Sequence, residues 1–251
     1  MSGNDHFATQ FLALHGFTGE GADFSALSSS ISGKWHCPDL PGHGSRKHAH
    51  PDEFSLPSLE NTLLGSNRKT ATGLGYSMGG RLLLNLAVRN PHFFARLILI
   101  SCSPGLTSAE ERRQRRISDE KWIHTLENTS LNKFLAAWWE QPIMRGMKNL
   151  PQHERDEIFA RRRNNSPDGL VRSLQNHGTG VLPSLWEQLP EIQIPTLIIV
   201  GAEDQKFREI GASMAEKLPR SNFCIIPNSG HAPHIENPGA TADRIQSLLL
   251  S

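Results

Sequence analysis

A glycine-flanked serine between a short apolar run and a longer one constrains this sequence most. Residues 70–74 predict a buried strand, residues 75–79 are Gly-Tyr-Ser-Met-Gly, and the apolar residues 81–88 indicate a helix. In this context the Gly-x-Ser-x-Gly pattern is typical of a nucleophile elbow, a sharp strand-to-helix turn in which glycines leave room for two close backbones. We therefore expect Ser77 to lie at the carboxyl end of a strand, as the nucleophile of an α/β-hydrolase fold.

Other short apolar runs predict the remaining strands, at residues 11–14, 35–40, 96–101, 196–201 and 223–226. Segments of helical length separate most of them. This alternation predicts βα units and a mostly parallel sheet. Because the runs are almost continuously apolar, we expect helices to cover the sheet on both faces.

Residues 103–190 interrupt the alternation. They are helical in period, rich in charge and tryptophan, and contain no convincing strand. An insertion between two strands on the carboxyl side of a parallel sheet predicts a cap over the site. We therefore expect a core made of residues 1–102 and 191–251, with residues 103–190 inserted as a helical lid.

Two loops late in the chain supply candidate partners for Ser77. His231 and Asp204 each follow a predicted strand, so both belong to the edge of the sheet where Ser77 lies. A serine hydroxyl needs a histidine to accept its proton, and that histidine needs a carboxylate to fix its tautomer. The order serine, acid, histidine is also the order that this fold uses. We predict the triad Ser77, Asp204 and His231, with Glu203 as the rival acid.

The backbone around the serine predicts an oxyanion hole, which needs two N–H groups aimed at developing negative charge. One belongs to Met78, the residue after the serine, and the other to Phe17, in the loop after the first predicted strand. His15 in the same loop is expected to brace it rather than to act as a base.

Composition excludes several other classes of protein. Lys and Arg number 26 against 25 acidic residues, without the strong basic excess of a nucleic-acid binder. No apolar run approaches the ~18 residues of a membrane span, and residues 1–9 lack the build of a signal peptide. Three cysteines without metal spacing indicate reduced thiols. We expect a cytoplasmic protein without a metal, a cofactor, or a nucleic-acid or membrane partner; the sequence sets no oligomeric state.

The arginines indicate the charge of the substrate. Arg81 follows the elbow at the mouth of the expected site, and two groups lie on lid helices, namely Arg112, Arg113, Arg115 and Arg116, and Arg161, Arg162 and Arg163. Most of these should be solvated or paired with acids such as Glu110, Glu111 and Asp119. A guanidinium fork nevertheless matches a carboxylate well. We therefore expect a small substrate with several carboxylates.

Several segments together resemble one family. They are residues 14–19, 39–44, 75–81, 103–106, 111–119, 138–142, 162–165, 201–207 and 230–238. The chain resembles the 2-succinyl-6-hydroxy-2,4-cyclohexadiene-1-carboxylate synthases of menaquinone biosynthesis, in the α/β-hydrolase superfamily. The similarity spans nearly the whole chain, and the lid segments and Arg81 distinguish this family from the rest of the superfamily. Residues 45–69 match nothing in it.

The resemblance implies a lyase that eliminates pyruvate from 2-succinyl-5-enolpyruvyl-6-hydroxy-3-cyclohexene-1-carboxylate. The triad would take a ring proton, and the enolpyruvyl group would leave as pyruvate. The residues carried over as substrate-binding are Arg81, Arg115, Arg162, Tyr76 and Trp138. Arg161 and Arg163 stay open as alternatives to Arg162, and Trp139 as an alternative to Trp138.

Two other functions stay open. A serine hydrolase acting on an acidic substrate, either a carboxylesterase or a carbon–carbon bond hydrolase, would use the same triad. A ligand receptor on the same fold would not need Ser77, Asp204 and His231, so the intact set argues against it. Release of pyruvate separates the lyase from the hydrolase, and binding without turnover would indicate the receptor.

Overall fold

One parallel sheet forms the centre of the molecule. The structure, a computed structural model, describes residues 9–65 and 71–250. Within these residues the strands lie in the order β2-β1-β3-β4-β5-β6, and every neighbouring pair is parallel. Their bounds are β1 (Gln10–Leu14), β2 (Lys34–His36), β3 (Ala71–Tyr76), β4 (Phe94–Ile100), β5 (Thr196–Gly201) and β6 (Ser221–Ile226). The predicted α/β-hydrolase architecture with a mostly parallel sheet is confirmed.

The order of the strands positions the site. The chain runs from β1 outward to β2, returns to β3 on the other side of β1, and then continues outward through β4 to β6. The connections therefore diverge between β1 and β3, which opens a crevice at the carboxyl ends of these two strands. The loops after β1 and β3 carry Phe17 and Ser77 to this crevice.

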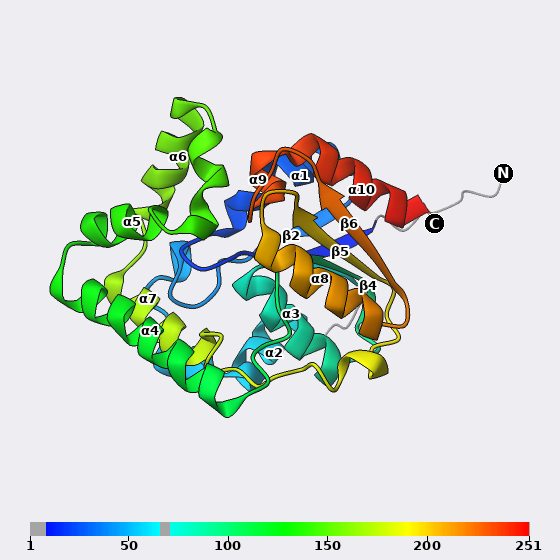
Figure 1. Cartoon of the computed structure of the whole chain (residues 1–251), viewed down its shortest axis with the longest axis horizontal. Coiled ribbons are helices and arrows are strands. Elements are labelled where there is room, and N and C mark those ends of the chain that lie inside the picture. Colours follow the sequence, from blue (N-terminus) through cyan, green and yellow to red (C-terminus); the bar gives the residue numbers. More distant parts are fainter. Residues whose placement is uncertain (1–8, 66–70, 251) are drawn as a thin grey trace.

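Helices cover both faces of the sheet (Figure 1). Alternate side chains of β1 enter different clusters: Leu12 and Leu14 pack in one apolar core, and Phe11 and Ala13 pack in another. The first core also takes side chains from α2 (Leu56–Leu64), α3 (Met78–Arg89) and α8 (Gln205–Lys217). The second takes side chains from α1 (Ser25–Ser30) and α10 (Pro238–Leu250), which contact each other.

Four longer helices lie between β4 and β5 in the sequence, and none of the described residues 103–190 is in a strand. Figure 1 shows these helices to one side of the sheet. A third apolar cluster joins α4, α5 and α7, and the N-terminus of α4 carries a Ser108–Glu111 capping box. Their bounds are α4 (Ala109–Asn128), α5 (Leu131–Trp139), α6 (Gln152–Arg162) and α7 (Pro167–His177).

Some expected boundaries shift. β2 ends at His36 because Pro38 and Pro41 supply no N–H to continue the ladder. Within residues 45–69, the part up to residue 65 contains α2 and a short 3-10 helix at Pro51–Phe54, whereas residues 66–70, including the expected first residue of β3, lie outside the described residues, as do residues 1–8. No helix of the described residues is long and apolar enough to span a bilayer.

Candidate active site

Ser77 occupies a strained turn between β3 and α3. Its backbone has φ 50° and ψ −110°, a conformation that non-glycine residues rarely adopt. The turn is tight because a Cβ atom on Gly79 would collide with the carbonyl oxygen of Leu14, and one on Gly75 would lie 2.5 Å from the Cα of Gly80. The predicted elbow is therefore present, and its glycines are required by close backbone contacts.

The structure brings together the three residues of the predicted triad. The Ser77 hydroxyl lies 3.0 Å from Nε2 of His231, and Nδ1 of His231 lies 2.6 Å from a carboxylate oxygen of Asp204. Because Asp204 accepts, Nδ1 carries the ring proton and Nε2 is free to accept the serine proton. The rival acid Glu203 is exposed, and its side chain has no bond to the ring among the described residues.

The loop that carries His231 is held by an acid to which the sequence analysis assigned no role, although it lies in the segment 230–238 that resembles the synthase family. The carboxylate of Glu236, in α9 (Pro233–Glu236), accepts the backbone N–H groups of Gly230 at 2.5 Å and Ala232 at 2.8 Å. These two residues flank His231. The sequence shows a glutamate five residues after the histidine. Only the folded loop shows that this glutamate binds the backbone on both sides of His231.

The geometry around the predicted oxyanion hole is consistent with that role. Met78 is the first residue of α3, so its N–H has no acceptor within the helix, and Phe17 lines the same cavity as Ser77. His15 is fully buried; its Nε2 accepts the N–H of Leu40 at 2.9 Å, so Nδ1 donates to the carbonyl of Gly16. Burial lowers the pKa of His15, and the neutral ring braces the loops after β1 and β2.

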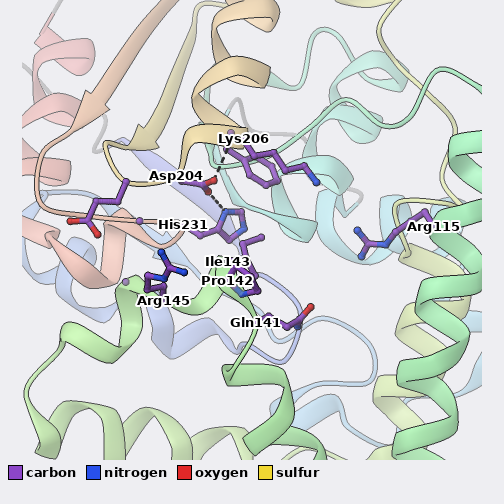
Figure 2. A pocket seen from close by; sticks show the side chains of 12 residues that line it. Arg115, Gln141, Pro142, Ile143, Arg145, Asp204, Lys206 and His231 are labelled. Carbon is purple, nitrogen blue, oxygen red and sulfur yellow. Dashed lines mark hydrogen bonds and ion pairs between the residues drawn. The ribbon is translucent and has the colours of Figure 1, made fainter.

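Three cavities meet at the triad. An inner cavity of about 130 Å³ contains the Ser77 hydroxyl region together with Arg81 and Arg115, and a smaller one of about 60 Å³ extends towards Tyr76 and Arg162. An outer pocket of about 420 Å³ opens beside His231 (Figure 2). Every residue that we predicted for the site lines at least one of the three cavities.

Arg81, Arg115 and Arg162 are held in different ways. Arg81 is buried and donates to the carbonyl of His177 at 3.1 Å; burial and the nearby Arg115 lower its pKa to about 10. Arg115 is half-buried and bonds Asp119 at 2.9 Å. The buried Arg162 bonds the carboxylate of Asp23 at 2.7 Å and keeps Nη1 without a partner among the described residues.

The structure separates Arg162 from its two alternatives. Arg161 forms an ion pair with Glu20, with 3.0 Å between Nε and Oε1, and the guanidinium of Arg163 stacks over the Phe159 ring. Of the three arginines, only Arg162 lines a cavity at the triad. Trp138 lines both inner cavities and Trp139 only the smaller one. Arg162 and Trp138 therefore have the placement that the resemblance implies.

The other arginines of the α4 group are engaged away from the site. Arg113 makes a bidentate pair with Glu110, as expected, whereas Arg112 and Arg116 bond backbone carbonyls and Glu111 caps its own helix.

His234, three residues after His231, is fully buried, and burial lowers its pKa to about 3. No cluster of three or more potential metal ligands forms within residues 9–65 and 71–250.

The chain is similar to known proteins over nearly its whole length. The α/β hydrolase family pattern matches residues 11–244. A Bacillus subtilis protein described as a putative 2-succinyl-6-hydroxy-2,4-cyclohexadiene-1-carboxylate synthase is 32% identical, over 96% of this chain and 90% of its own length. The Salmonella typhimurium synthase is 28% identical, over 94% of this chain and 92% of its own.

The chain belongs to this synthase family of α/β hydrolases. The structure of MenH from S. aureus superposes with a TM-score of 0.91 at 30% identity, covering 100% of this chain and 96% of that one. An esterase from Exiguobacterium antarcticum shares the fold alone, at a TM-score of 0.79 and 20% identity. This synthase family and that esterase thus share one fold.

Proposed function

We propose that this enzyme is a carbon–oxygen lyase that eliminates pyruvate from 2-succinyl-5-enolpyruvyl-6-hydroxy-3-cyclohexene-1-carboxylate, in menaquinone biosynthesis. The observation that carries the proposal is the cavity in which the Ser77–His231–Asp204 chain meets Arg81 and Arg115. A simple ester substrate gives no reason to place cations there. A substrate with three carboxylates does.

The chemistry follows from the difference between substrate and product. The product has ring double bonds at positions 2 and 4, so the proton leaves ring carbon 2, next to the succinyl carbonyl. The C–H electrons form the 2,3 double bond, the old 3,4 double bond moves to 4,5, and the bond from carbon 5 to the enolpyruvyl oxygen breaks. Enolpyruvate then takes a proton on carbon and becomes pyruvate.

Each residue then has a defined task in the proposal. Ser77 abstracts the ring proton while His231 withdraws the serine proton, and Asp204 stabilises the resulting imidazolium. The negative charge that develops on the succinyl oxygen is bound by the N–H groups of Phe17 and Met78. The carboxylates are bound by Arg81, Arg115 and Arg162, with Tyr76 and Trp138 shaping the cavity. No cofactor enters this scheme.

We further propose that residues 103–190 act as a lid over this site. Support comes from the lid residues that line the inner cavity, among them Arg115, Trp138 and Ser173. A cytoplasmic location without nucleic-acid or membrane partners accompanies the proposal, as the composition predicts.

A pyruvate-release assay with the enolpyruvyl substrate tests the function. The wild-type enzyme should release one pyruvate per diene formed, and Ser77→Ala should lower kcat by about 10²–10⁴-fold, the usual contribution of a positioned proton-transfer group. Rapid turnover of p-nitrophenyl acetate without pyruvate would replace the lyase by the hydrolase. Binding of the substrate without any turnover would favour the receptor.

A further inference from the structure

The Glu236 carboxylate uses both oxygens to hold the backbone around His231. One oxygen accepts the N–H of Gly230 and the other the N–H of Ala232. Two donors on one carboxylate hold the residues on either side of His231, so the two bonds restrict movement of the backbone that carries its ring. The carboxylate is mostly buried, so no water layer replaces the two donors at low cost.

The same carboxylate contacts the segment inserted between β4 and β5. Gly146 begins a short 3-10 helix, Gly146–Asn149, and a Cβ atom built on it would collide with one oxygen of Glu236 and lie 2.8 Å from the other. A Cβ on Gly230 would lie 3.5 Å from the Cα of Gly146. The backbone at position 146 therefore rests directly on the carboxylate and the His231 loop, and only glycine leaves enough room.

The residues that precede Gly146 in the sequence line the cavities at the triad. Gln141 and Ile143, just before Gly146, line both the inner cavity and the outer pocket next to His231 (Figure 2). A displacement of Gly146 would therefore change the lining of both cavities and remove the packing contact that confines the Glu236 carboxylate under the His231 loop.

We propose that Glu236 is a positioning residue that couples the seating of the 141–149 segment to the alignment of His231. The proposal rests on the proposed function for its consequence, since an aligned His231 matters only if it takes the Ser77 proton. It makes the seating of this segment and the alignment of the proton relay one structural event, so that the relay is complete only when the 141–149 segment is seated on Glu236.

A double-mutant cycle on Glu236→Ala and Gly146→Ala tests the coupling. Each single variant should lower kcat at least about tenfold with a smaller change in KM, because proton transfer rather than carboxylate binding is impaired. In the double variant the methyl group added at position 146 meets no carboxylate, so kcat should equal that of Glu236→Ala within about twofold. If the loss of kcat in the double variant equals the product of the two single losses, the proposal is overturned.

Two control variants test whether adding a methyl group to a glycine, or removing a carboxylate, lowers kcat at a position away from the His231 loop. Gly239→Ala places a methyl group where nothing lies within 4 Å, and Glu216→Ala removes an exposed carboxylate from α8. Both should keep the wild-type kcat. Glu236→Gln, which keeps the size and one acceptor of the side chain, should fall between the wild type and Glu236→Ala, and it serves if the alanine variant does not fold.

A readout without turnover separates this proposal from the proposed function. The His231–Asp204 hydrogen-bond proton should give a far-downfield proton NMR resonance in the wild type, which broadens or shifts in both single variants and no further in the double variant. If the wild type releases no pyruvate, the proposed function fails while the NMR cycle still decides the coupling. An unchanged resonance in Glu236→Ala would overturn it.

Discussion

Arg81 is a buried cation with little compensation from the protein. Its guanidinium donates to the neutral carbonyl of His177, and its Nε has no partner among the described residues. Burial lowers the pKa of Arg81 from 12.5 to about 10. A shift of this size means that the folded protein disfavours the charged guanidinium by about 3 kcal/mol. The site therefore carries a destabilising charge that a bound carboxylate would neutralise.

Arg81→Met should separate stability from activity. Removing the uncompensated charge should raise the free energy of unfolding by about 1–3 kcal/mol in urea titrations, because the apolar side chain has no desolvation cost. The same variant should lose about 10–100-fold in kcat/KM, the contribution of a charged hydrogen bond. Arg89→Met, at the exposed end of the same helix, should change neither quantity appreciably. A variant that is both less stable and fully active would contradict this account.

The helix α4 carries arginines with two different roles. Arg113 pairs with Glu110 on the exposed face, whereas Arg115, two residues on, lines both the inner cavity and the outer pocket. The bond from Arg115 to Asp119, four residues later on the helix, orients the guanidinium towards the cavity. The position of each arginine on the helix thus determines whether its charge faces the cavity or the solvent.

Arg115→Ala should lower kcat/KM for the enolpyruvyl substrate by roughly 10–100-fold, about 1.5–3 kcal/mol, as expected for one charged hydrogen bond at a half-exposed position. Arg113→Ala is the matched control on the same helix and should stay within about twofold of the wild type, since exposed pairs contribute little. Equal losses in the two variants, measured by pyruvate release, would mean that the helix and not the charge at position 115 is responsible.

The elements of the core could be predicted because their signals are local. An apolar run between Gly-rich loops indicates a strand wherever it packs, and Gly75 and Gly79 mark the elbow because the backbone contacts need them. The triad followed from the rule that strand ends of a parallel sheet share one edge. Ser77, Asp204 and His231 are therefore readable from the sequence although they lie far apart in it.

The partners of the site residues could not be predicted, because they depend on packing between distant segments. Arg162 and Asp23 are 139 residues apart and meet only when α6 lies on the loop after β1. Gly146 and Glu236 likewise meet only when the segment between β4 and β5 packs against the loop after β6. Nothing in a helical period tells which arginine faces inward and which meets a neighbouring acid.

Across the whole molecule, several buried histidines are held neutral. Burial lowers the pKa of His177 to about 4 and of His234 to about 3, and it also lowers the pKa values of His15 and His43. An unfolded chain protonates these rings near pH ~6.5, whereas the folded protein does not. The unfolded state therefore binds more protons below that pH, and acid favours unfolding.

The thermal unfolding midpoint should be flat above about pH 7 and fall steadily from about pH 6.5 towards about pH 4. Several kcal/mol of stability should be lost over this range, because the window lies between the unfolded pKa and the lowered folded values. His234→Phe should reduce the slope of the midpoint against pH, while His124→Phe, at an exposed position, should not. A midpoint that does not change between about pH 7 and about pH 4.5 would contradict the assignment of neutral buried rings.

Tyr76 precedes the elbow serine and is the one tyrosine in the sequence. Its ring centroid lies 5.4 Å from that of His231 and 4.4 Å from that of His234, and it packs against Gly16 of the loop that carries Phe17. Biosynthetic replacement of tyrosine by fluorotyrosine would therefore place a single fluorine label at the centre of the site. One ¹⁹F line would report directly on the state of the histidine, and no resonance assignment would be needed.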